Sequence, residues 1–161
     1  DYADAGSELF SDAQEAELWR ASVKPLAALL QGVEAKAGRG APVVVGYHRP
    51  CHADLGDGLG DPDFSLLSSL LGVRLRTPAK GGCCGFGGIL QLSAPQLSES
   101  VGRACWDNLD AVLGFTNAPE VAPAYVLSGC SGCVMQLSAT APDSIAGGGR
   151  VGHWLEIVRT K

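Results

Sequence analysis

The chain has 161 residues, of which 46% are hydrophobic, and a formal net charge of −5. That length suits a single domain that can bury a sizeable core. The acidic balance, with no cluster of Lys or Arg, argues against a nucleic-acid-binding surface. The longest apolar stretches fall far short of the ~20 residues that a membrane-spanning helix needs. No charged-then-apolar leader opens the sequence, so we expect a cytoplasmic location.

The first forty residues are expected to form a helical segment. Hydrophobic side chains recur there at helical spacing between Leu18 and Val33. Pro25 is expected to kink or split the helix, because proline lacks the amide proton that a helix interior needs. We predict that this segment, residues 1–40, precedes a cysteine-rich domain at residues 41–161.

Short β-branched runs alternate with amphipathic segments after residue 40. We expect strands at 43–48, 73–77, 124–128 and 151–153, and helices at 61–72, 95–113 and 130–139. Strands separated by helices predict an α/β fold, in which a small, mostly parallel sheet carries helices on both faces in a Rossmann-like arrangement. In the longest helix, the expected buried face consists of Leu97, Val101, Cys105, Leu109 and Val112 or Leu113.

Five of the six cysteines form one spaced set in the sequence. The set consists of Cys51, Cys83, Cys84, Cys130 and Cys133. Each of these cysteines follows a predicted strand or lies in the glycine-rich connection after one. The loops that follow parallel strands share one edge of the sheet, so we expect the five thiols to meet there. Six cysteines are too few for a disulfide-stapled secreted domain, which points to metal or redox chemistry in a reducing compartment.

Thiolates are soft ligands that bind zinc or an iron–sulfur cluster. The adjacent pair Cys83 and Cys84 favours ligation, because a disulfide between neighbouring residues strains the intervening peptide. A zinc site takes only four ligands, so we expect an iron–sulfur cluster, with zinc as the alternative. Two further alternatives are a thioredoxin-like dithiol, made of Cys130 and Cys133 alone, and a set of buried free cysteines.

The remaining cysteine and the histidines carry weaker signals. Cys105 lies on the apolar face of the longest predicted helix, which favours core packing over a place in the site. His48 and His52 flank Cys51, and His153 lies near the last strand. Each histidine could tune a metal centre by hydrogen bonding, ligate the metal, or satisfy a backbone carbonyl. No pattern indicates a catalytic nucleophile or acid pair.

The cysteine pattern resembles a known family. Cys51, then Cys83-Cys84-Gly85, then Cys130-x-x-Cys133 is similar to the cysteine-rich CCG domain of heterodisulfide reductase B subunits and of iron–sulfur subunits in glycolate and lactate oxidation systems. The resemblance covers residues 43 to 158. The surrounding residues look most like the glycolate oxidase iron–sulfur subunit, in the segments 47 to 52, 92 to 98 and 153 to 158. The segment 84 to 88 is similar to the lactate-utilisation relatives.

The resemblance implies electron transfer. In such systems a flavin-bearing subunit oxidises glycolate or lactate, and this domain passes the electrons to an acceptor with the help of further iron–sulfur domains. The five cysteines of the set would bind a [4Fe–4S] cluster, or the non-cubane [4Fe–4S] assembly of the heterodisulfide reductases. Peripheral association with the inner face of the membrane, through those partners, is compatible with this function. The alternatives are a thiol/disulfide reductase domain of the heterodisulfide reductase type and a zinc-bound structural module of a larger complex.

Overall fold

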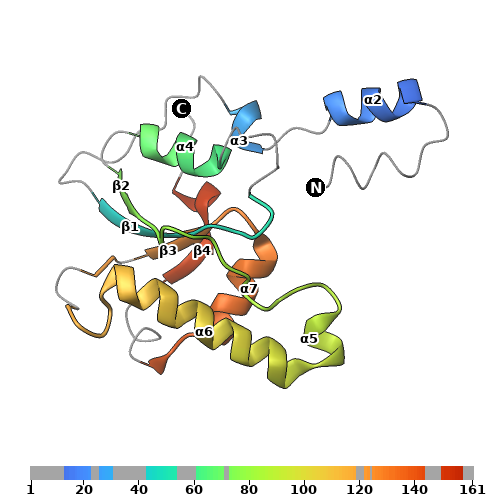
Figure 1. Cartoon of the computed structure of the whole chain (residues 1–161). Coiled ribbons are helices and arrows are strands. Elements are labelled where there is room, and N and C mark those ends of the chain that lie inside the picture. Colours follow the sequence, from blue (N-terminus) through green and yellow to red (C-terminus); the bar gives the residue numbers. More distant parts are fainter. Residues whose placement is uncertain are drawn as a thin grey trace.

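The structure is a computed structural model of the chain. It describes residues 13–22, 26–30, 43–53, 61–70, 73–118, 122–123, 125–143 and 150–157. The strands in this part form one four-stranded parallel sheet in the order β2-β1-β3-β4 (Figure 1). They are β1 (Val43–His48), β2 (Val73–Arg76), β3 (Tyr125–Ser128) and β4 (Arg150–His153). The predicted α/β fold with a parallel sheet is confirmed.

The strand order creates a switch point between β1 and β3. From β1 the chain crosses first to β2 on one side, and later returns to β3 on the other side. In the register of the second pair, Val45 lies beside Tyr125 and His48 lies beside Ser128. Ligands of open α/β sheets bind beyond the carboxyl ends of the strands at such a point. The carboxyl edge near His48 and Ser128 is therefore the place to look for a site.

Helices cover both faces of the sheet (Figure 1). On one face lie the short helix α3 (Leu26–Leu29) and α4 (Pro62–Ser69), and on the other lie α6 (Pro95–Leu113) and α7 (Ser131–Ala139). The remaining described elements are α2 (Ala13–Ser22), the single turn α5 (Leu90–Ser93) and the 3₁₀ turn η2 (Trp154–Glu156).

Each face of the sheet contributes to its own hydrophobic cluster. Val45, Tyr47 and Leu127 pack with Leu67 of α4, whereas Val126 packs with the buried side chains of α6 and α7. Successive side chains of a strand point to opposite faces, so Tyr47 and His48 of β1 lie on opposite sides of the sheet. The two central strands, β1 and β3, are thus buried on both sides, as parallel strands between two helical layers must be.

The buried face of α6 agrees with the predicted one in part. Cys105, Leu109 and Leu113 are buried as expected, whereas Leu97 is 55% exposed. The complete face that packs inward consists of Ser98, Gly102, Cys105, Trp106, Leu109 and Leu113. The indole Nε1 of Trp106 donates a hydrogen bond to the carbonyl oxygen of Leu137 in α7, at 3.0 Å. Contact with α7 therefore decides how α6 is rotated, which spacing within α6 alone could not reveal.

The structure tests only part of the prediction that residues 1–40 form a helical segment. Two helices, α2 and α3, lie on either side of residue 25, which itself falls outside the described residues together with residues 31–42. Ala27 of α3 is buried in the cluster that contains Leu67. The division into a segment at 1–40 and a domain at 41–161 stays a prediction. None of the helices that the structure describes is long and apolar enough to cross a membrane.

Replacing Trp106 by Ala is expected to lower the free energy of unfolding by about 3–5 kcal/mol, because it leaves a cavity between α6 and α7. Chemical denaturation of the whole chain measures the loss. Leu97→Ala is the matched control on the same helix, and its exposed side chain should cost no more than about 0.5 kcal/mol. Equal losses in the two variants would contradict the face assigned to α6.

Candidate metal centre

The five cysteines of the predicted set all lie beyond the carboxyl ends of strands. Cys51 follows β1, and Cys83 and Cys84 lie in the loop after β2. Cys130 follows β3 as the N-cap of α7, and Cys133 lies in the first turn of that helix. Because the strands are parallel, these connections share one edge of the sheet. The structure thus brings together what the sequence spreads over more than eighty positions.

The buried part of this edge is made of Cys84, Cys133 and His48. All three side chains are almost fully buried. The two sulfur atoms lie 3.1 Å apart, and a ring nitrogen of His48 and the two sulfurs all lie within 4.8 Å of one another. Thiolate and imidazole groups are the donors that soft and borderline metal ions prefer. These three residues therefore form a candidate metal site.

The two buried thiols are electrostatically unequal. A hydrogen bond from the Cys133 thiol lowers the pKa of Cys84 far below its ordinary value, and His48 adds to the effect. The same hydrogen bond raises the pKa of Cys133, because a charge there would face the charge on Cys84. Of the two thiols, Cys84 is therefore the one that gives up its proton more readily. A thiolate, unlike a thiol, is ready to bind a metal or attack a disulfide.

The other three cysteines of the predicted set lie nearer the surface. Cys51 and Cys83 are exposed and Cys130 is half-buried. Partial burial and then the charges of Cys83 and Cys84 raise the pKa of Cys51. The amide N–H of Gly85 donates to the sulfur of Cys83 at 3.4 Å. The centre is therefore sheltered on the side of the helices and accessible on the side of Cys51 and Cys83.

Two glycines allow the cysteine loop to sit closely between α6 and α7. Gly85 has a φ of 85°, in the left-handed region that residues with a Cβ avoid. A Cβ there would also collide with the backbone oxygen of Ser98 on α6. Phe86 packs on the first turn of α7, where a Cβ on Gly132 would lie 2.7 Å from its ring. The Gly that completes the CCG motif is thus a requirement of packing beside the thiols.

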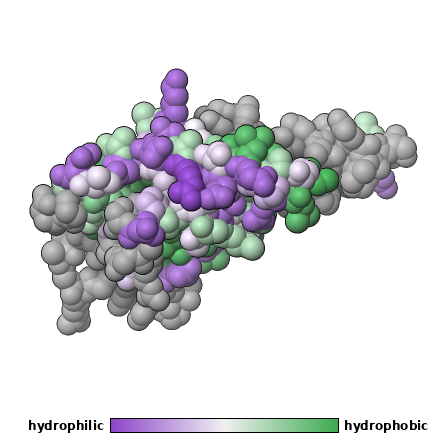
Figure 2. Space-filling view, turned by 90° about the horizontal axis from the view of Figure 1, so that it is seen from below, coloured by the Kyte–Doolittle hydropathy of each residue, from purple (hydrophilic) through white to green (hydrophobic). Residues whose placement is uncertain are grey.

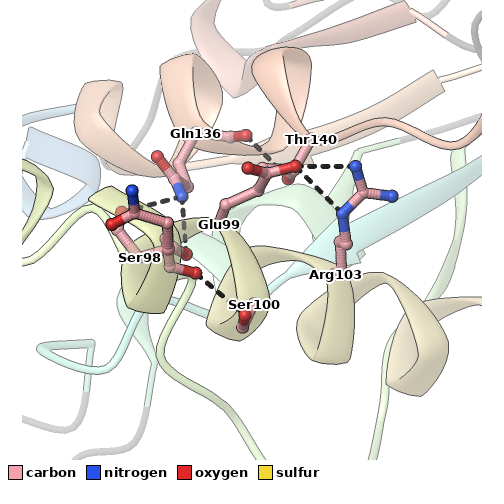
Figure 3. Close-up of polar contacts among 7 residues, drawn as sticks. Ser98, Glu99, Ser100, Arg103, Gln136 and Thr140 are labelled. Carbon is pink, nitrogen blue, oxygen red and sulfur yellow. Dashed lines mark hydrogen bonds and ion pairs between the residues drawn. The ribbon is translucent and has the colours of Figure 1, made fainter. Parts of the chain in front are cut away.

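A short series of hydrogen bonds links the two helices to the cysteine loop, and Figure 3 shows the contacts between α6 and α7 within it. The side-chain amide of Gln136 on α7 donates to the backbone oxygen of Ser98 at 2.9 Å and to its hydroxyl at 3.1 Å. That hydroxyl donates to the carbonyl oxygen of Gly85 at 2.7 Å. Since α7 carries Cys133 and the loop carries Cys84, these hydrogen bonds help to hold the two thiols in position relative to each other. Neither Ser98 nor Gln136 was predicted from the sequence as a site residue, because neither belongs to a cysteine motif.

Cys105 lies outside the predicted set but touches the centre. It is buried in α6, as expected for a core residue, and its sulfur lies 3.6 Å from Nδ1 of His48. Burial raises the pKa of Cys105 to about 12, with the charge of Cys84 adding to the effect. The prediction of core packing is confirmed. The contact with His48, 57 positions away along the chain, gave no signal in the sequence.

The three histidines have different places. His48, for which the sequence left several roles open, belongs to the buried centre. His153 ends β4 and caps η2, where its Nδ1 accepts the amide N–H of Leu155 at 3.2 Å and its own amide N–H donates to Glu156 at 2.8 Å. His52 is half-buried in the turn after β1. Of the three, His48 is the one that the structure brings to Cys84 and Cys133.

Comparison with known proteins agrees with this arrangement. The family model of the CCG cysteine-rich domain matches residues 45–138, more than half of the chain. Lactate utilization protein A of Oceanobacillus iheyensis is 29% identical over 94 residues, which cover 58% of this chain and 35% of that protein. The B subunit of the CoM/CoB fumarate reductase of Methanothermobacter marburgensis is 33% identical over 75 residues, which cover 43% of this chain and 15% of that relative. No solved structure matches the chain significantly.

Gly85→Ala is expected to displace the cysteine loop from α6. The matched control is Gly88→Ala, because Gly88 also has a positive φ of 52° but has open space around the position of a Cβ. The two variants share a backbone cost of about 1–2 kcal/mol, and overpacking should cost Gly85→Ala a further 1–3 kcal/mol, roughly.

Chemical denaturation measures this difference, and the rate at which Cys84 reacts with a thiol reagent in the metal-free protein should rise in Gly85→Ala alone. Identical stability and reactivity of the two variants would contradict the assigned packing of the loop.

Proposed function

The chain belongs to the family of CCG cysteine-rich domains, and from that premise we propose that it is an electron-transfer domain that holds an iron–sulfur cluster. The observation that carries the proposal is the buried contact between Cys84 and Cys133, whose sulfurs lie 3.1 Å apart. Cys51, Cys83 and Cys130 supply further thiols around that contact. We propose all five as ligands of the cluster.

The donors present suit such a cluster. Five thiols are available, whereas a zinc site takes four. The Nε2 atom of His48 is buried and has no hydrogen-bond partner among the described residues. A buried polar atom of this kind calls for a partner, and a group bound at the thiols would supply one. The number of thiols favours iron–sulfur over zinc, while the nuclearity, a cubane [4Fe–4S] or a non-cubane assembly, is the finer part of the proposal.

When bound, the cluster supplies one-electron redox chemistry. The residues of the chain supply charge compensation and shielding from water. The first turn of α7 directs the positive end of the helix dipole toward Cys130 and Cys133, and the Gly85 amide donates to Cys83. Burial of Cys84 and Cys133 excludes water from one side. The exposed thiols leave the other side open to a partner.

The physiological system is proposed on the basis of the relatives. We propose that a flavin-bearing subunit oxidises a 2-hydroxy acid, glycolate or lactate, and delivers its electrons to this domain. Similarity to lactate utilization protein A supports the proposal, as do the segments that resemble the glycolate oxidase iron–sulfur subunit. The chain spans 35% of the first relative and 15% of the second. We propose further iron–sulfur domains as partners in the cytoplasm, with peripheral association at the inner face of the membrane through those partners.

An exposed hydrophobic surface beside the cysteine loop supports docking of such a partner. Ile89 and Leu92 are 77% and 83% exposed, and Leu97 at the start of α6 is exposed as well. Figure 2 views the molecule from the side of α5 and α6, where hydrophilic residues dominate and hydrophobic residues form smaller patches. Apolar groups that gather on a surface are typical of a face that another protein covers, and we propose that these three side chains contribute to such a face.

A second candidate function is thiol/disulfide reduction. The contact between the sulfurs of Cys84 and Cys133 is the observation that favours it, because a thiol of lowered pKa next to a second thiol can exchange with a disulfide. Similarity to part of a CoM/CoB fumarate reductase is compatible with this function. The thioredoxin-like version requires Cys130 and Cys133 alone, and the position of Cys84 against Cys133 argues for a larger thiol set.

Iron and acid-labile sulfide are expected in the protein after anaerobic reconstitution with ferrous iron and sulfide. Cys84→Ala should lose most of this iron and with it part of the stability, because metal binding is coupled to folding. Cys105→Ala is the matched control, which should keep its iron and cost about 1 kcal/mol of stability. One tightly held zinc and no sulfide would instead support the structural module, and equal iron loss in both variants would mean that the wrong cysteines were assigned.

Electron relay and disulfide reduction are distinguished by whether the domain turns over disulfides or only accepts electrons from a flavin enzyme. As a relay, the loaded domain should accept electrons from a flavin enzyme that oxidises glycolate or lactate, and it should not turn over small disulfides. Cys133→Ala should abolish this transfer. Turnover of a disulfide by the loaded domain would favour the heterodisulfide reductase type, and turnover by metal-free protein through Cys130 and Cys133 would favour the thioredoxin-like mechanism.

A further inference from the structure

The imidazole of His48 has two distinct surroundings. Its Nδ1 atom lies 3.6 Å from the sulfur of Cys105. Its Nε2 atom is buried and has no hydrogen-bond partner among the described residues. His48 is the last residue of β1, and its ring lies near the sulfurs of Cys84 and Cys133. A neutral imidazole carries its proton on one nitrogen only, so the contact with Cys105 decides what the other nitrogen offers.

In the contact between Cys105 and His48, the thiol is expected to donate the hydrogen bond and the imidazole to accept it. A buried thiol keeps its proton, because the surrounding apolar side chains, among them Trp106 and Leu109, disfavour a thiolate. A neutral thiol is a weak acceptor, whereas the unprotonated imidazole nitrogen is a good one. The S–H group of Cys105 is therefore the donor and Nδ1 the acceptor. The ring proton is then on Nε2.

We propose that Cys105 is a positioning residue that holds His48 in the Nε2–H tautomer, so that His48 donates a hydrogen bond to the sulfur centre of Cys84 and Cys133 and does not ligate a metal. The opposite tautomer would place the proton on Nδ1 and leave a lone pair on Nε2 as a metal ligand. The proposal gives the buried Nε2 atom a hydrogen-bond partner, because sulfur at the centre accepts the hydrogen bond that Nε2–H donates. The identity of the bound group in this proposal rests on the proposed function, whereas the tautomer of His48 does not depend on it.

The tautomer has a consequence for electron transfer. A hydrogen bond to sulfur stabilises the more negative, reduced state of a cluster, and such bonds are among the features that set its potential. Loss of the donor is therefore expected to shift the reduction potential to more negative values. Ligand number and iron content should not change, because no bond to the metal is lost.

The tautomer can be measured on the metal-free chain. In ¹⁵N-histidine-labelled protein, the ring ¹⁵N shifts separate a protonated from an unprotonated nitrogen, and His48→Gln identifies the His48 signals. We expect Nε2 protonated in the parent protein and a mixture of tautomers in Cys105→Ala. Cys105→Ser should restore the parent tautomer, because a hydroxyl also donates to Nδ1. A proton on Nδ1 in the parent protein would overturn the proposal.

The second readout is the reduction potential of protein reconstituted anaerobically with ferrous iron and sulfide. Cys105→Ala and His48→Phe should both shift the midpoint to more negative values at parental iron content, while His48→Gln, whose amide can donate, should shift it less. His153→Gln, at a histidine that caps η2, is the control and should leave the potential unchanged. Directly bound imidazole nitrogen in pulsed electron paramagnetic resonance spectra of the parent would overturn the proposal. Failure to bind iron would count against the proposed function, whereas the tautomer of the metal-free chain would still decide the role of Cys105.

Discussion

The parallel pairing of β1 with β3 is the constraint on which the rest of the site depends. It sets His48 beside Ser128 and brings the connections to Cys51 and Cys130 to one edge of the sheet. Because side chains alternate along a strand, a slip of one residue would turn His48 to the face of α3 and α4, away from Cys84. The register of two short strands therefore decides whether the buried centre exists at all.

The cysteine loop depends in turn on the contact between α6 and α7. Gly85 fits against α6, Phe86 packs on α7, and Gln136 joins the two helices through Ser98. These contacts order a loop that glycine-rich sequence alone would leave with many conformations, and the entropy of ordering it is lost during folding. A thiol pair held in this way needs little reorganisation when it binds a metal or changes its charge.

The burial of the centre gives its members unequal chemistry. Cys84 and Cys133 are chemically identical, yet a single hydrogen bond between them in an apolar surrounding separates their pKa values in opposite directions. Cys105 has the same side chain and stays a neutral thiol, because burial dominates its environment. The exposed Cys51 and Cys83 lie on the side from which a partner can approach. One residue type thus has different acidity and accessibility according to its depth.

Local sequence patterns were sufficient to predict the four strands and the main helices, and to predict at which edge of the sheet the cysteines lie. The expected strand at 43–48 and helix at 95–113 agree with β1 and α6, and the five cysteines reach one edge because parallel strands end there. Periodicity reports which residues of one element share a face, so Cys105 could be assigned to the core. It does not report how far a helix is rotated against its neighbour, so Leu97 was expected inside and Trp106 was missed. The contacts of His48 with Cys105 and of Gln136 with Ser98 were decided only by tertiary packing, because they join residues whose separation along the chain carries no repeating pattern.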